Sequence, residues 1–269
     1  EVHVVEELLK VLKRDFNGKE YTRRLESRAR DEGYIVLGIP GGTTTLMGAM
    51  MTASTEVVSM LLESGANVEG TDVMGNDGFM LASAFGRPDN LQCWLERVKD
   101  WDLSRQNTVV GGCALGHAVN VGANKLETVK VLLDAGASLD YRTYGGGFVL
   151  TSLIGSDDSD PDVLRLVLEK LGSSCSVEAY SSIVNYKRSS TTFKFRGIHF
   201  IAKVLYRTGT YKTRLIEHLA ISSGTTALNT AVRRGDVEIV KILLESGADP
   251  HSLYRVLDRW KCFAVPGID

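Results

Sequence analysis

Short apolar stretches separated by glycines recur along this chain. The clearest example is residues 224–250, where a first apolar stretch at 227–232 ends at Gly235 and a second at 237–244 ends at Gly247. This spacing predicts two short helices joined by a tight turn. A helical pair of this size cannot bury its own apolar face, so we expect it to stack on copies of itself.

Residues 42–70 are such a copy. Aligned without a gap, they match Gly42 to Gly224 and Thr44 to Thr226, and the block Leu-Leu-Glu-Ser-Gly-Ala at 61–66 recurs at 243–248. Three further copies of the helical pair complete the series. One of them closes with VLLDAGASLD, and the other two are weaker. The openings of the series are spaced by 33, 36 and 34 residues, at Gly42, Gly75, Gly111 and Gly145. A period near 33 residues is typical of helical repeat arrays.

The pattern resembles the ankyrin repeat family, whose unit opens with G-x-T-P-L-H-x-A and closes with V-x-x-L-L-x-x-G-A-D. No copy keeps the family's Pro or His, and Thr44-Thr45-Leu46-Met47 and Thr226-Ala227-Leu228-Asn229 stand in their place. Proline presets the first helical turn, and a histidine nitrogen can tie neighbouring loops together. We therefore expect the family fold with less local stability per repeat.

The resemblance implies an all-α fold, an ankyrin-type helix-turn-helix solenoid with short β-hairpin-like loops between repeats and one irregular helical insertion. We expect five parts. They are an N-terminal helical cap at 1–40, repeats one to four at 41–171, an irregular basic helical segment at 172–223, the last repeat at 224–252, and a C-terminal capping helix and tail at 253–269.

Composition limits the class of protein. Apolar residues make up 43% and charged residues 24% of the 269 residues, and no apolar run approaches the roughly 18 residues of a membrane span. The four cysteines form no C-x-x-C pair, which favours an intracellular location, cytoplasmic by default. Because the chain begins with Glu1, an organellar location after removal of a targeting segment stays open.

Residues 179–216 contain no acidic side chain, whereas this stretch carries eight Lys and Arg. The net charge of the chain is −2, so all other residues together carry −10. On a helix through 193–207, a basic ridge is expected on the wet face, with Ile198, Ile201, Ala202, Val204 and Leu205 buried opposite. The ridge and its continuation comprise Arg196, His199, Lys203, Arg207, Lys212 and Arg214.

Two interpretations of this segment stay open. Its aromatic residues pack an irregular repeat while the cations are merely solvated, or the cations meet an anionic partner. Within the second, a protein with an acidic patch is favoured over nucleic acid because the whole chain is slightly acidic, and an anionic lipid surface is a further candidate.

Motifs that would carry catalysis or hold a cofactor are weak. Residues 38–44 are glycine-rich but lack the lysine of a phosphate-binding loop, Cys113 and His117 are only two potential metal ligands, and the acidic residues at 157–160 lack the spacing of a calcium loop. We therefore expect no catalytic residue, no cofactor and no metal.

The expected function is that of a non-catalytic adaptor or scaffold that binds a protein through its concave face, its inter-repeat loops and the basic helix. A constitutive structural subunit of a larger assembly is the alternative, and a regulatory part of an enzyme is the third. The family's binding positions fall on first helices and loops, here Met50, Met51, Thr52, Met74, Phe85, Asn120, Val121, Tyr144, Arg233, Arg234 and Tyr254.

Overall fold

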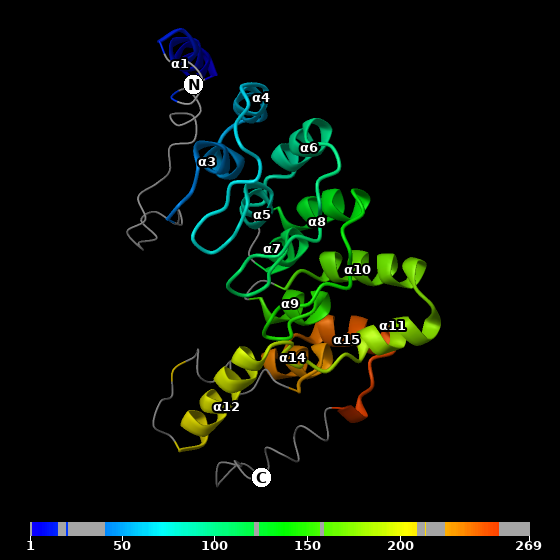
Figure 1. Cartoon of the computed structure of the whole chain (residues 1–269). Helices are drawn as coiled ribbons and strands as arrows, with labels where there is room; N and C mark the ends of the chain where they lie inside the picture. Colours follow the sequence, from blue (N-terminus) through cyan, green and yellow to red (C-terminus); the bar gives the residue numbers. More distant parts are fainter. Residues whose placement is uncertain are drawn as a thin grey trace. The chain divides into compact units, whose positions relative to one another are not determined.

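The computed structural model describes residues 2–15, 20, 41–120, 124–156, 159–208, 213 and 224–252 (Figure 1). The chain forms two compact units, Glu1–Ser138 and Leu139–Asp269. Each unit is described by itself. The predicted second helix of the N-terminal cap and the predicted C-terminal capping helix lie outside the described residues.

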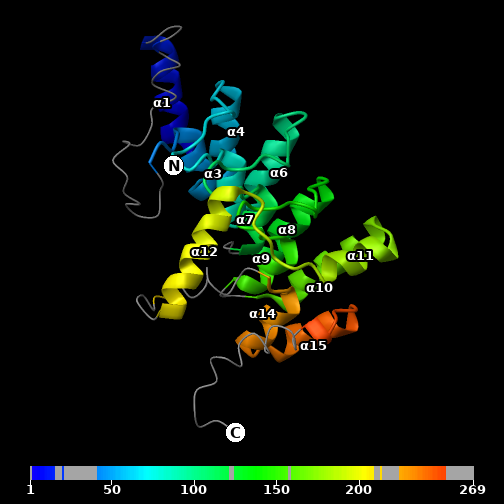
Figure 2. The same cartoon turned by 60° about the horizontal axis from the view of Figure 1, so that its bottom comes forward.

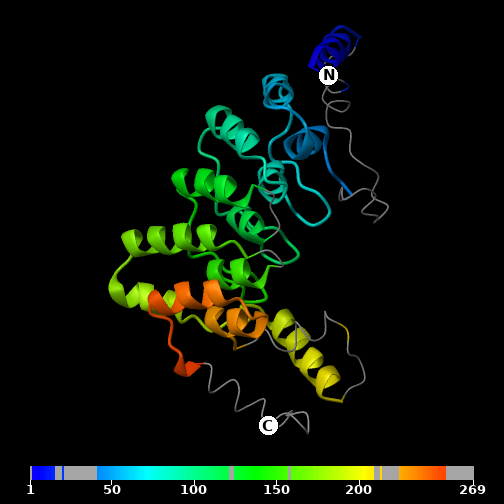
Figure 3. The same cartoon turned by 180° about the vertical axis from the view of Figure 1, so that it is seen from behind.

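Unit 1 contains three helical pairs in two layers. The inner helices α3, α5 and α7 pack side by side, and the outer helices α4, α6 and α8 form the second row, as Figures 2 and 3 show from two sides. Helix α1, Val2–Asp15, packs on α4. The pairs are α3 (Thr45–Thr52) with α4 (Thr55–Glu63), α5 (Gly78–Ala84) with α6 (Pro88–Arg97), and α7 (Ala114–Asn120) with α8 (Lys125–Asp134).

Unit 2 contains two further pairs that stack directly on each other. Helix α9 packs on α14, and α10 packs on α15, although some 50 residues separate α10 from α14 in the sequence. Two additional helices, α11 and α12, lie in the intervening segment. The bounds are α9 (Val149–Gly155), α10 (Pro161–Ser174), α11 (Val177–Val184), α12 (Phe193–Thr208), α14 (Ala227–Arg234) and α15 (Val237–Glu245).

The repeated sequence motifs act as helix boundaries. Thr44, Asp77 and Thr226 each precede an inner helix and accept a hydrogen bond from the backbone N–H three residues on. Such a cap stabilises a helix by about 1 kcal/mol. At the other end, the glycine of each Leu-Leu-x-x-Gly-Ala block has a positive φ, between 81° and 92° at Gly65, Gly136 and Gly247. The following alanine N–H then bonds back to the first leucine of the block, which closes the outer helix.

The core lies between the two layers of helices. In unit 1 the fully buried Trp94 of α6 contacts Phe79 of α5, with ring centroids 6.2 Å apart, and Met47, Met51 and Leu81 form a cluster between α3 and α5. In unit 2 Phe148 is fully buried at the start of α9. The short inner helices therefore contribute most of their side chains to packing.

The loops that connect successive pairs share one hairpin-like hydrogen bond. It joins Asp72 N–H to Asn76 O at 2.9 Å, Asn107 N–H to Gly112 O at 2.8 Å and Thr143 N–H to Gly147 O at 2.9 Å. The same bond closes the loop before α14, but there it joins Arg188 N–H to Thr225 O at 2.9 Å. Residues 189–224 therefore replace the few residues at the tip of an ordinary connecting loop. The part of the interrupting segment from residue 189 on is thus an insertion at a loop tip that contains α12, whereas α11 precedes it.

Candidate protein-interaction surfaces

A buried polar network fixes the first two connecting loops of unit 1. The Asp72 carboxylate accepts hydrogen bonds from Met74 N–H and Asn76 N–H, both at 2.8 Å, and from Asn76 Nδ2 at 2.9 Å. Asn107 Nδ2 donates to Asn76 Oδ1 at 2.9 Å, which joins the second loop to the first. Asp72, Asn76 and Asn107 are all buried. The loop backbones are thus held in one conformation by side chains that water does not reach.

The tips of the same loops carry exposed apolar side chains. Val73 is 55% exposed, and Val109 and Val110 on the neighbouring loop are exposed as well. A hydrogen bond from Thr108 N–H to Met74 O, at 3.1 Å, ties the two tips together. Exposed apolar side chains on a fixed backbone are well suited to burial against a partner.

The inner helices present a second row of exposed residues at their C-terminal ends. Thr52 ends α3, Phe85 follows α5 and Asn120 ends α7, and all three side chains are exposed. Since α3, α5 and α7 pack side by side, these positions share one edge of unit 1. Two methionines beside Thr52 were also predicted to belong to this exposed row. Met50 and Met51 are almost completely buried, so the prediction that they face a partner is wrong.

The remaining predicted surface residues are dispersed. Met74 is half-buried at a loop tip, and Tyr144 is half-buried with its ring centroid 6.3 Å from that of Phe195. Arg233 and Arg234 are exposed at the end of α14 in unit 2. Val121 and Tyr254 lie outside the described residues.

Helix α12 contacts the protein through one residue from each of its two predicted faces. His199 and Ala202 are buried, and Ser190 Oγ lies 2.7 Å from His199 Nδ1. By contrast Ile201, expected in the core, is 58% exposed, and Val204 is exposed too. The prediction is therefore wrong for His199, Ile201 and Val204, whereas Ala202 is buried as expected. The small side chain of Ala202 permits close packing, and the His199 ring lies within hydrogen-bonding distance of Ser190, in the segment that precedes the helix.

The other members of the predicted basic ridge are placed differently from one another. Arg196 is exposed, and its Nε donates to Ser190 O at 3.2 Å, whereas Lys203 is half-buried. Arg207 lies within α12, but its side chain is outside the described residues, as are Lys212 and Arg214. Among the described members, His199 is buried and therefore does not share an exposed face with Arg196.

Cationic residues also anchor the base of the insertion. Arg188 Nε donates to Gly145 O at 3.2 Å, and burial lowers the pKa of its guanidinium. The guanidinium of Arg142 lies over Tyr186, 4.2 Å from the ring centroid, and 5.0 Å from that of Phe148. Residues 186–191 are thereby fixed against the loop at 143–147, and α12 emerges from an ordered base.

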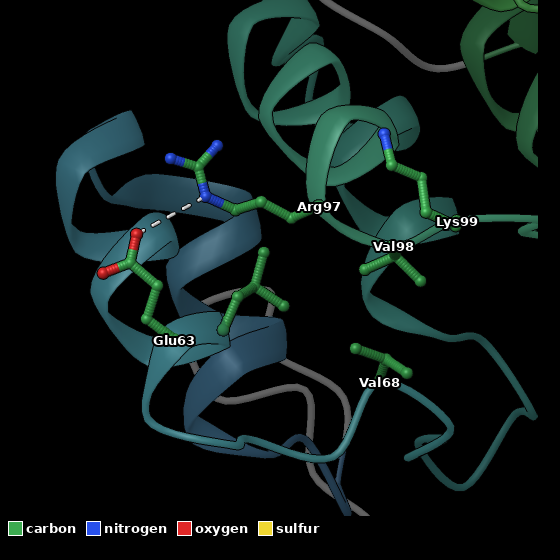
Figure 4. A pocket seen from close by; sticks show the side chains of 6 residues that line it. Glu63, Val68, Arg97, Val98 and Lys99 are labelled. Atoms are coloured by element: carbon green, nitrogen blue, oxygen red, sulfur yellow. Dashed lines mark ion pairs between the residues drawn. The ribbon is translucent and has the colours of Figure 1, made fainter.

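Unit 1 also has an open depression of about 500 Å³ between the C-terminal ends of α4 and α6. Figure 4 shows its polar side chains, with the Nε of Arg97 3.8 Å from the Glu63 carboxylate. The remaining lining residues are Leu62, Val68, Val98 and Lys99. The oppositely charged side chains of Arg97 and Glu63 thus pair with each other, and the depression is open to solvent, whereas small-molecule sites are usually enclosed.

Potential metal ligands do not cluster in the described part of the chain. It holds no group of three or more His, Cys, Asp or Glu side chains that could bind a metal. Cys113 is buried, which raises the pKa of its thiol, and burial lowers the pKa of His117. None of the described helices is both long and apolar enough to cross a membrane.

Residues 223–254 match the family model for the ankyrin repeat. This part of the chain is therefore an ankyrin repeat. The matched repeat is the pair α14 and α15. The cap of α14 recurs at α3 and α5, and the closing glycine after α15 recurs after α4 and α8. Ankyrin repeats are in general protein-protein interaction modules.

The chain is similar to a curated protein in sequence and to a solved ankyrin repeat domain in fold. The nuclear factor NF-kappa-B p105 subunit of Gallus gallus is 28% identical over 208 residues, which cover 77% of this chain and 17% of that relative. This chain thus spans about a sixth of that relative's length. The ankyrin repeat domain of Bcl-3, described as a unique member of the IkappaB protein family, superposes with a TM-score of 0.57 at 21% identity, over 93% of this chain and 82% of that domain.

An ankyrin repeat domain from Acinetobacter baumannii AYE is similar to the same degree. It superposes with a TM-score of 0.56 at 21% identity, over 92% of this chain and 98% of that domain. These likenesses establish the fold, and the predicted ankyrin-type solenoid class is confirmed.

Two features of these surfaces were missed by the sequence analysis. The Asp72, Asn76 and Asn107 network had a signal, since small polar residues beside turn glycines commonly bond to the loop backbone. The outward apolar stripe of α12 had none, because helical periodicity separates two faces without saying which one the rest of the protein covers.

Proposed function

We propose that this chain is a non-catalytic interaction module that binds a protein partner through the loop tips and inner-helix ends of unit 1. The binding surface comprises Thr52, Val73, Phe85, Val109, Val110 and Asn120. Ankyrin repeats in general are such modules, and the fold is typically non-catalytic, so the proposal adds the surface and the way it works.

The observation that carries this proposal is the contrast between the tips and the bases of the two loops. Val73 and Val109 are exposed, whereas Asp72 and Asn107, their immediate or near neighbours in sequence, are buried in one hydrogen-bonded network. Burial of a valine side chain contributes on the order of 1.5 kcal/mol. Because the backbone is already ordered, little of this is lost in fixing the loops on association.

The C-terminal ends of the inner helices extend the proposed binding surface beyond the loop tips. Phe85 supplies an exposed aromatic ring at the end of α5, between polar Thr52 and Asn120 on the neighbouring helices. A central apolar anchor with polar neighbours is the arrangement that dominates binding energy in protein interfaces.

We also propose that α12 and its cations form a separate surface that recognises an anionic partner. Its support is the exposure of Lys194 and Arg196 and the lack of acidic residues throughout 179–216. The two surfaces lie in different units and can be tested independently.

Affinity purification of the full chain with quantitative mass spectrometry tests the unit 1 surface. The variant Val73→Glu/Val109→Glu places two charges on the loop tips, and Val237→Glu, at an equally exposed position on α15, is the matched control. We expect proteins captured by the wild type to fall at least about tenfold with the double variant and to persist with the control.

Circular dichroism and the urea midpoint must be unchanged in both variants, since all three positions are exposed. If every captured protein is retained by Val73→Glu/Val109→Glu, the loop tips are not the binding surface.

A further inference from the structure

Helix α12 exposes an apolar stripe on the side that faces away from the protein. Phe193 is 90% exposed, Phe200 is 69% exposed, and Ile201 and Val204 continue the stripe. At 100° per residue these four side chains fall within an arc of about 100°. Over the eleven steps from residue 193 to residue 204 the stripe extends about 16 Å along the helix. A stripe of this size is unusual on a surface that is exposed to water alone.

Cations border this stripe on both sides. Lys194 lies at the edge next to Ile201, and Arg196 lies at the opposite edge next to Phe200, and both are exposed. Lys187, also exposed, precedes the helix, and no acidic residue occurs from 179 to 216. The outward surface of α12 thus combines apolar side chains at its centre with positive charge at its edges.

The stripe itself contains almost no group that could direct a hydrogen bond. The other positions within its arc are Gly197 and, at the last residue of the helix, Thr208. A groove in a partner protein is recognised by polar contacts that set orientation and register, as well as by apolar anchors. A fluid apolar phase beneath an anionic surface requires no such contacts, because aromatic rings enter it in any register while Lys and Arg stay among the headgroups.

The position of the helix also permits shallow insertion. It is carried on an insertion at a loop tip and extends away from α9, α10, α14 and α15 of its own unit (Figures 1 and 3). Its inward side is held by His199 and Ala202, which leaves the outward side uncovered by the described part of unit 2.

We propose that α12 docks this protein on an anionic phospholipid membrane, with Phe193 and Phe200 inserted at the interface and Lys187, Lys194 and Arg196 among the headgroups. This rests on the proposed recognition of an anionic partner by α12 and names that partner. Docking is peripheral, since a helix of this kind lies in the plane of the membrane surface. Each cation near an anionic surface strengthens the attraction, and the effect is screened by salt.

Co-flotation of the purified full chain with unilamellar vesicles tests this proposal. The vesicles are phosphatidylcholine alone, or phosphatidylcholine with about 30% phosphatidylserine. We expect binding to the phosphatidylserine vesicles that is at least about tenfold stronger than to phosphatidylcholine alone, and that declines as the salt concentration is raised.

Matched pairs of variants separate the apolar from the ionic contribution. Phe193→Ser/Phe200→Ser removes both rings, with Val237→Ser as the control at an exposed position of α15. Lys187→Glu/Lys194→Glu reverses two charges, with Lys130→Glu/Lys241→Glu, on exposed positions of α8 and α15, as the control. Each α12 variant should weaken vesicle binding by about tenfold or more, and the control variants should bind nearly as the wild type does.

A Phe200→Trp variant measures insertion directly. Its additional tryptophan emission should shift to the blue with phosphatidylserine vesicles and be quenched by brominated lipid. If the two-phenylalanine variant binds as the wild type does, attraction by charge alone explains the result and insertion is wrong. If the wild type binds neither kind of vesicle, the proposal is wrong, and an acidic protein becomes the partner to seek.

The outcomes for the two surfaces are distinguishable. The loop-tip variant Val73→Glu/Val109→Glu should retain vesicle binding, since its substitutions lie in unit 1. Conversely the α12 variants should retain the proteins that the unit 1 surface captures. Failure of vesicle binding therefore overturns the membrane proposal and leaves the unit 1 surface standing.

Discussion

The substitution Asn107→Ala tests whether side chains hold the loop tips of unit 1 in place. Asn107 is fully buried between two connecting loops. Its Oδ1 accepts hydrogen bonds from Val110 N–H at 3.0 Å and Gly112 N–H at 3.2 Å, and its Nδ2 donates to Asn76 Oδ1 at 2.9 Å. Alanine fills part of the space but replaces none of these bonds.

The size of the effect follows from the groups that would lose this partner. Gly112 N–H and Asn76 Oδ1 are both buried, and a buried polar group that loses its hydrogen-bond partner costs about 1–3 kcal/mol. Val110 N–H is nearer the solvent and can bond to water. We therefore expect Asn107→Ala to lower the free energy of unfolding by about 2–4 kcal/mol.

Urea unfolding followed by tryptophan fluorescence measures this change. Two of the three tryptophans, Trp94 and Trp101, lie in unit 1 with ring centroids 5.0 Å apart, so the signal reports on the unit that contains the network. Asn120→Ala is the control because Asn120 is exposed. A change within about 0.5 kcal/mol is expected for the control. The same small change for Asn107→Ala would refute the idea that the network fixes the loops.

Two further predictions concern a buried charge and a buried glycine. Arg105→Met should destabilise the protein by about 2 kcal/mol at pH 7, because Asp77, whose pKa burial already raises, loses the guanidinium 3.3 Å from its Oδ2. Protonation of Asp77 relieves that loss, so urea midpoints should show the deficit shrinking as the pH falls to about 4, and a constant deficit would contradict this assignment. Gly146→Ala should cost more than Gly235→Ala. Both glycines have positive φ, but only at Gly146 would a Cβ overlap the backbone of Ser189, and equal unfolding midpoints would show that the base of the insertion is not tightly packed.

Most of the repeat architecture could be predicted from the sequence because the same residues repeat the same local task. Gly65, Gly136 and Gly247 each end an outer helix with a positive φ, and this conformation is far more accessible to glycine than to other residues. Threonine or aspartate before an inner helix was equally informative, as at Thr44 and Asp77. Each of these signals depends only on residues that are close together in the sequence, so it can be recognised without the structure.

Loop stability was harder to predict, because it depends on partners from different repeats. The family histidine is missing from every repeat opening, from which we expected weaker ties between loops. In unit 1, however, Asn107 of one loop bonds to Asn76 of the preceding one and its Nδ2 lies 3.4 Å from His117 Nε2. A different set of residues thus makes the tie. Whether each repeat is less stable than a family repeat stays a prediction.

The place of the insertion could not be read from periodicity either. Glycine spacing located the interruption between Gly145 and Gly224, but the bond from Arg188 N–H to Thr225 O joins residues far apart in the sequence. That bond and the packing of α9 on α14 and of α10 on α15 show that repeat four stacks directly on the last repeat. From residue 189 on, the interruption is therefore an enlarged loop tip rather than a degenerate repeat, and α12 lies in that loop tip.

The orientation of α12 carries the main functional argument. Hydrophobicity divides this helix into two faces, and the usual rule buries the larger apolar side chains. Here the contact with the protein uses His199 and Ala202, and the rings of Phe193 and Phe200 lie in solvent. Covering both rings would contribute about 3 kcal/mol or more, a substantial fraction of the stability of a typical domain. A helix that leaves this free energy unused in its own fold is suited to gain it by association, and the cations at the edges of the stripe favour an anionic surface for that association.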